Sequence, residues 1–101
     1  MMVALEEAVM EIIVNAGQSR SLCFEALRAA REGNMEEARN LLREADGYSR
    51  QAHQMQTKLI EQDAGEARQP MTLIMVHAQD HLMTSLLARE LSEEIIQLYQ
   101  R

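Results

Sequence analysis

The chain has 101 residues, which is enough for one domain of ordinary size and too few for two. Ala, Leu, Met, Glu, Gln and Arg dominate, and aromatic residues make up 3% of the chain, a composition that favours helix. The formal net charge is −6, and no Lys/Arg cluster exists to bind a phosphate backbone. We therefore expect a single all-α domain over residues 1–101, with no nucleic-acid partner.

The chain contains one cysteine, Cys23, so an internal disulfide is excluded. Because Cys23 occupies an apolar helical position, we expect it to be buried as a small hydrophobic residue. Residues 1–8 carry two glutamates and no Lys or Arg, unlike the start of a secretory signal. No apolar run reaches the roughly 18 residues needed to cross a bilayer. These features predict a cytoplasmic protein without direct membrane insertion.

Glycine and proline divide the chain at two places, Gly33-Asn34 and residues 65–70. Within each segment, apolar residues recur at alternating spacings of three and four, the pattern of coiled-coil packing. Asn34 is a suitable N-cap for the second helix, and Pro70 suits the first turn of the third. The short connections predict an elongated antiparallel three-helix hairpin. Its helices are predicted over about residues 3–31, 35–64 and 70–100.

The third predicted helix has apolar residues on two faces. Its first face is a seam with the spacing of a coiled coil: Leu73, His77, Asp80, Thr84, Leu87, Leu91 and Leu98. The second face is Met71, Met75, Ala78, Leu82, Leu86 and Ile96. The other two helices of the hairpin can cover one apolar face of the third helix. The second apolar face therefore predicts packing against helices supplied by further copies of the chain. We therefore expect a homo-oligomer.

Polar residues interrupt this leucine seam at His77 and Asp80, and His81 lies beside them. A buried carboxylate is costly unless it is paired, hydrogen-bonded or bound to a metal. His77 and Asp80 are at i, i+3, and His77 and His81 at i, i+4, so all three can interact. Three interpretations remain open: polar residues that fix the register of an assembly, a zinc site, or a nucleophilic histidine oriented by Gln79, Asp80 or His81.

The string VHAQDHLMT at residues 76–84, followed by LLAREL at 86–91, resembles the lactose/chitobiose (cellobiose) type IIA component of the bacterial phosphoenolpyruvate-dependent sugar phosphotransferase system. Two further strings resemble the first and second helices of that family, IIVNAGQSRS at residues 12–21 and AHQMQT at residues 52–57. The resemblance covers essentially the whole chain.

This resemblance implies a phosphotransferase component that assembles as a trimer of three-helix hairpins with coiled-coil-like packing. His77 would accept phosphate through Nε2 from the histidine-containing phosphocarrier protein and pass it to a cysteine of a sugar-specific IIB component. His81 and Gln79 would support the phosphorylated histidine. Asp80 would be shared among three subunits on the trimer axis, where a divalent cation, Mg²⁺ by resemblance, offsets the carboxylate charges.

The implied pathway is the uptake of a disaccharide such as chitobiose, cellobiose or lactose, and the sequence does not choose among them. The alternative from another class is a non-catalytic helical adaptor or oligomerisation bundle, in which the His/Asp cluster only fixes assembly. Two residues outside the cluster have separate expectations. His53 falls between polar residues of the second helix and is expected to be structural or on the surface, whereas Met83 is a candidate interface residue.

Overall fold

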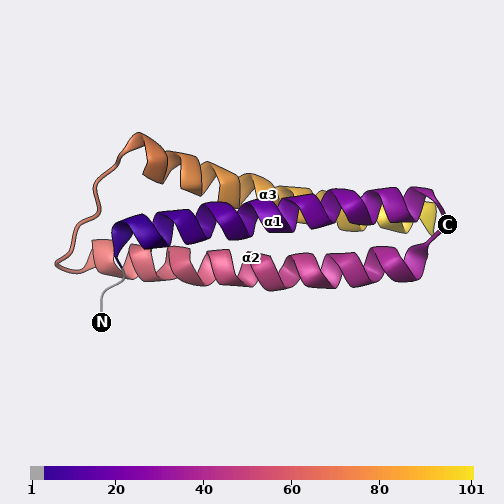
Figure 1. The fold of residues 1–101 in the computed structure, drawn as a ribbon, viewed down its shortest axis with the longest axis horizontal. Coiled ribbons are helices and arrows are strands. Elements are labelled where there is room, and N and C mark those ends of the chain that lie inside the picture. Colours follow the sequence, from indigo (N-terminus) through magenta and orange to yellow (C-terminus); the bar gives the residue numbers. More distant parts are fainter. Residues whose placement is uncertain (1–3) are drawn as a thin grey trace.

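The computed structural model describes residues 4–101, which form the three predicted helices (Figure 1). They are α1 (Leu5–Arg31), α2 (Met35–Ala64) and α3 (Leu73–Tyr99), and no strand occurs in residues 4–101. The helices α1 and α3 run in one direction and α2 in the other (Figure 1). The bundle measures 51 × 23 × 18 Å. The all-α hairpin is confirmed, and the predicted first residue of the first helix lies outside the described residues.

The turn between α1 and α2 follows the prediction closely. Gly33 adopts a φ of 86°, a left-handed conformation that costs glycine no steric strain. The Asn34 backbone N–H donates to the carbonyl of Ala29 at 2.8 Å, which closes the end of α1. The Asn34 side chain accepts a hydrogen bond from the Glu37 N–H at 3.4 Å and caps α2 as predicted.

The start of α3 differs from the prediction, because the helix begins at Leu73 and Pro70 lies outside it. Thr72 is the N-cap, and its hydroxyl accepts a hydrogen bond from the Met75 N–H at 3.2 Å. The connection that precedes it is held by the Gln69 N–H, which donates to the Asp63 carboxylate at 2.7 Å. A threonine oxygen satisfies a free amide of the first turn, which a proline ring does not do.

The core consists of two apolar clusters along the bundle. The cluster near the α1–α2 turn comprises Leu22, Cys23, Ala26, Ala29, Ala30, Ala38, Leu42, Ala45 and Ile96. The cluster near the α2–α3 connection comprises Ala8, Val9, Ile12, Ala52, Leu59, Met75, Ala78 and Leu82. Small alanines in both clusters let the helix backbones approach closely. Buried Ser19 of α1 and Ser49 of α2 also pair, with their hydroxyl oxygens 2.7 Å apart.

Polar side-chain contacts join α3 to α2. The guanidinium of Arg39 donates two hydrogen bonds to Glu93, at 2.6 and 2.7 Å. Arg89 donates hydrogen bonds to the Asp46 carboxylate at 2.7 and 3.1 Å, and these bonds are the main reason that the pKa of Arg89 is raised. A further contact joins Gln56 and Gln79. These contacts fix how α3 is rotated about its own axis, and hence which face it leaves open.

Candidate functional site

The leucine seam of α3 is exposed in the single chain. The exposed fractions are 86% for Leu73, 54% for Leu87 and 61% for Leu98. On the other apolar face Met75, Ala78, Leu82 and Ile96 are buried and Leu86 is half-buried, whereas Met71 precedes the helix and is 78% exposed. The two-faced character of α3 is confirmed: one face forms the core, and one copy of the chain leaves the other uncovered.

The predicted cluster lies on this open face. His77 and Asp80 are exposed and His81 is half-buried. The two imidazole rings meet edge to face, with centroids 4.5 Å apart and an interplanar angle of 78°. The three residues and Thr84 line one shallow hollow, and the Thr84 hydroxyl donates to the Asp80 backbone carbonyl at 2.8 Å. The structure thus brings together His77, Asp80 and His81, with the His77 ring open to an approaching partner.

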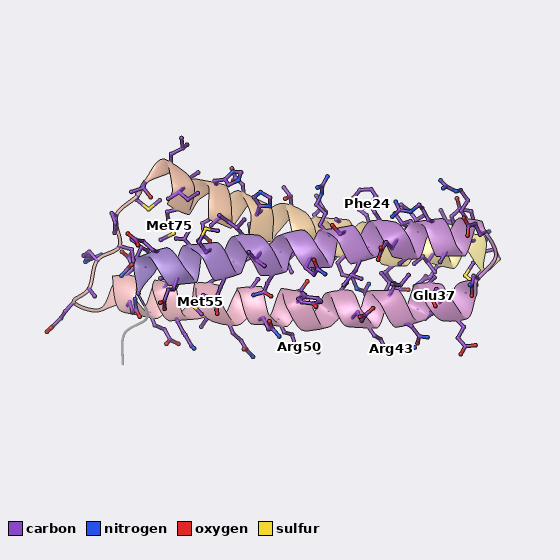
Figure 2. The ribbon with its side chains drawn as sticks, in the orientation of Figure 1. Phe24, Glu37, Arg43, Arg50, Met55 and Met75 are labelled. Atoms are coloured by element: carbon purple, nitrogen blue, oxygen red, sulfur yellow. The ribbon has the colours of Figure 1, made fainter. Side chains whose placement is uncertain are left out.

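Arg20 also lines the hollow, and the sequence patterns described above predict no role for this residue. It comes from α1, so only the packing of α1 against α3 places it beside the histidines. Its guanidinium carbon lies 5.4 Å from the centre of the Phe24 ring, a cation–π distance. Figure 2 shows Phe24 on the side of α1 that faces away from α2. Within residues 4–101, no carboxylate oxygen comes within 4.0 Å of Arg20.

Asp80 contributes a single carboxylate to the hollow. Across residues 4–101, no group of three or more His, Cys, Asp or Glu side chains is arranged to hold a metal ion. A zinc site built from a single chain therefore finds no third ligand in this part of the molecule. Carboxylate oxygens are suitable ligands for Mg²⁺, but Asp80 fits such an ion only as a ligand shared between copies of the chain.

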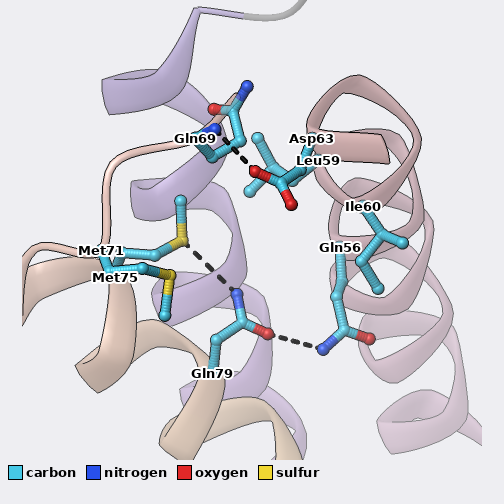
Figure 3. Close-up of a pocket in the computed structure, with 8 residues that line it drawn as sticks. All are labelled: Gln56, Leu59, Ile60, Asp63, Gln69, Met71, Met75 and Gln79. Carbon is cyan, nitrogen blue, oxygen red and sulfur yellow. Dashed lines mark hydrogen bonds between the residues drawn. The ribbon is translucent and has the colours of Figure 1, made fainter. Parts of the chain in front are cut away.

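Gln79 is not brought to His77, so the prediction that it supports this histidine is not met within the chain. Its side-chain oxygen accepts a hydrogen bond from Gln56 Nε2 at 2.6 Å, and its nitrogen donates to Met75 Sδ at 3.6 Å (Figure 3). The physical reason is helical geometry, since residues two apart lie on different faces. Gln79 instead lines a separate hollow with Gln56, Leu59, Ile60, Asp63, Gln69, Met71 and Met75 (Figure 3).

Three other residues singled out by the sequence lie outside the hollow. His53 is exposed on α2, as expected. Met83 is 58% exposed on α3, which leaves it accessible to a partner. Cys23 is fully buried, and its burial is the main reason that the pKa of the thiol is raised. A buried thiol with a raised pKa is a poor nucleophile, which confirms that Cys23 is a packing residue.

None of the helices in residues 4–101 combines the length and the apolar character required to cross a membrane.

Comparison with known proteins identifies the family. The family model for the lactose/cellobiose-specific IIA subunit of the PTS, the phosphotransferase system, matches residues 7–100. The N,N'-diacetylchitobiose-specific EIIA component of Escherichia coli strain K12 is 50% identical over 96% of this chain and 84% of its own length.

Two solved structures agree with this match. The cellobiose-specific enzyme IIA of Bacillus anthracis superposes with a TM-score of 0.93 at 37% identity, over 99% of this chain and 92% of that one. The Escherichia coli IIA(chitobiose) chain, solved in complex with HPr, superposes with a TM-score of 0.84 at 48% identity, over 97% and 95% of the two chains. The chain therefore belongs to the lactose/cellobiose-specific IIA family of the phosphotransferase system, whose members are phosphotransferase components that transfer phosphate through a histidine.

Proposed function

We propose that His77 is the phosphorylated histidine, and that the protein carries phosphate from HPr, the histidine-containing phosphocarrier protein, to a cysteine of a IIB component. The observation that carries this proposal is the exposed His77 ring in a hollow on α3. His53 is also exposed on α2, but within residues 4–101 no second imidazole ring contacts it. The structural relative named for its complex with HPr supports the choice of donor.

The transfer consists of two in-line displacements at phosphorus. The Nε2 lone pair of neutral His77 attacks the phosphoryl group of the donor, a nitrogen–phosphorus bond forms on His77, and the donor nitrogen keeps the electron pair of the broken bond. The thiolate of the acceptor then attacks, and His77 leaves with its electron pair. Both partners must reach the same ring in turn, so an exposed histidine and a modest, transient interface suit this reaction.

His81 acts beside His77 in this proposal. Its ring meets the ring of His77 edge to face at 4.5 Å, and this contact limits the rotation of the nucleophilic imidazole. A fixed ring presents its attacking nitrogen in a constant direction, which reduces the entropy lost when the donor docks. His81 is therefore proposed as a positioning residue.

The leucines of the exposed seam are proposed to assemble three copies of the chain through coiled-coil-like packing that leaves the His77 ring accessible at the edge of the interface. Leu73, Leu87, Leu91 and Leu98 are each more than half exposed in one copy and become buried when three α3 helices pack together. Such packing would bring the Asp80 carboxylates near the symmetry axis, where like charges repel. Mg²⁺ bound by these oxygens would offset the repulsion. The proposed trimer functions in the cytoplasm.

The transported sugar is proposed to be a disaccharide. The relative of 50% identity is named for N,N'-diacetylchitobiose, and the structure of highest TM-score reported above is named for cellobiose. The proposal includes chitobiose, cellobiose and lactose alike. A phosphocarrier must recognise its two protein partners and does not bind the sugar itself, so its site does not distinguish these sugars.

Phosphorylation in a defined mixture tests the function. The protein is incubated with phosphoenolpyruvate, enzyme I and HPr, and incorporation of acid-labile, base-stable phosphate is measured. Wild type is expected to take up phosphate and His77→Ala to take up none. His53→Ala is the matched control, since His53 is another exposed histidine outside the hollow. Equal incorporation in wild type and His77→Ala would overturn the assignment, and absence of phosphate from all three proteins would favour a non-catalytic adaptor.

A further inference from the structure

We propose that Arg20 binds the phosphoryl group while His77 carries it. The inference deepens the proposed function and rests on the phosphorylation of His77. The position of Arg20 is the first observation in its favour: it lines the same hollow as His77, although it comes from another helix. A phosphoryl group on the exposed His77 ring therefore occupies a space that the guanidinium borders.

The charge of the hollow is the second observation. A phosphoryl group carries a charge of about −1.5 to −2 at neutral pH, and Asp80 adds a further negative charge to the same hollow. Of the five lining residues, Arg20 is the one that remains positively charged at every pH of interest. Without it, phosphorylation would place two anions side by side in a protein whose net charge is already −6.

The availability of Arg20 is the third observation. Arg39 and Arg89 are bound to carboxylates of the bundle, so their charges are already compensated. Arg20 instead lies over the face of Phe24, which holds the guanidinium in place without neutralising it. Its planar fork of N–H donors can form two parallel hydrogen bonds to phosphoryl oxygens. No proton moves in this contact, and Arg20 stays bound to oxygen while the bonds of phosphorus to nitrogen change.

Substitutions of Arg20 test the inference in the intact protein. Arg20→Gln removes the charge, and Arg20→Lys keeps it but loses the fork. Arg28→Gln is the matched control, because Arg28 is an exposed arginine of the same helix that does not line the His77 hollow. Phospho-HPr is the donor, and the rate of phosphate uptake is measured as a function of its concentration. Helix content and melting temperature are recorded for each variant by circular dichroism.

We expect Arg20→Gln to lower the maximal rate of uptake about tenfold, with a smaller change in the donor concentration at half-maximal rate. Arg20→Lys should recover part of the rate, and Arg28→Gln should match wild type. The ³¹P resonance of the phosphorylated proteins, titrated with pH, supplies a readout that a structural role would not change. Loss of the neighbouring cation should raise the pKa of the phosphoryl group in Arg20→Gln. Asp80 and His81, which also line the hollow, are the same in every variant, so a difference between variants reports on Arg20.

Equal uptake rates and equal ³¹P titrations for Arg20→Gln and Arg28→Gln would overturn the role of Arg20. That result would leave His77 intact as the carrier, provided that His77→Ala takes up no phosphate. Uptake by His77→Ala would instead overturn the proposed function itself. If Arg20→Gln fails to fold, the Arg20→Lys variant tests the inference instead. A wild-type rate and a wild-type ³¹P shift in Arg20→Lys would contradict hydrogen bonding through the guanidinium. A slower rate with an altered ³¹P shift would support that hydrogen bonding.

Discussion

Replacing Leu87 and Leu91 of α3 with alanine tests whether the exposed seam is the assembly surface of the protein. The two side chains are 54% and 52% exposed in the single chain, so about half of each remains to be covered. Full burial of a leucine contributes roughly 1.5–3 kcal/mol, and covering the exposed half therefore contributes about 1 kcal/mol per side chain. Three copies give about 3 kcal/mol per position, and the double variant loses about 6 kcal/mol of assembly free energy.

Each 1.4 kcal/mol is a factor of ten, so the association constant of the trimer should fall by about four orders of magnitude. Sedimentation equilibrium over a dilution series measures this constant. Ile60→Ala is the matched control, because Ile60 is 59% exposed but lies on α2, outside the seam. The double variant should keep the helical circular dichroism of the wild type. An association constant equal to that of Ile60→Ala would refute the assignment of the seam.

Two further predictions concern charged residues. Asp80→Leu should preserve or increase the stability of the trimer, because the substitution removes three carboxylates that repel one another. The stability of the variant trimer should no longer depend on a chelator, because the proposed metal ligands are gone. Sedimentation with and without chelator measures this, and dissociation of the variant to monomers would show that the carboxylate is required. The hydrogen bond from Arg39 holds the pKa of Glu93 below its ordinary value of 4.5. Its stabilising contribution is therefore present above that value and is lost as the pH falls through the lower folded-state pKa. Glu93→Gln should flatten the pH dependence of the free energy of urea unfolding at pH values below the ordinary pKa of a glutamate, and an unchanged slope would contradict the ion pair.

The helices themselves were predictable because their signals are local. Apolar spacing follows from the helical repeat, and Asn34 caps α2 through a contact only three residues away. The start of α3 was misplaced because Pro70 and Thr72 both suit a helix N-terminus. The Gln69 N–H donates a hydrogen bond to Asp63 of α2, and this contact keeps the residues before Thr72 in the connection between α2 and α3. This tertiary contact has no signature in the spacing of the residues.

The candidate site likewise contains contacts that the sequence predicts and contacts that it does not. His77 and His81 could be paired from the sequence, because residues four apart lie on one face of a helix. The expectation that Gln79 supports His77 rests on closeness along the chain, whereas within the single chain its side chain binds Gln56 of α2. Arg20 was missed altogether, because no local pattern links a residue of α1 to a residue of α3.

The sequence by itself determined the three helices, the surplus apolar face of α3 and the histidine pair, since each follows from the period of one helix. Only the tertiary structure decided that the seam of His77 faces outward, that Gln79 faces α2, and that Arg20 lies beside the histidines. The physical reason is that the rotation of α3 is set by contacts between helices, among them Arg39–Glu93 and Asp46–Arg89. Such contacts join residues far apart in the chain, and no single helix contains them.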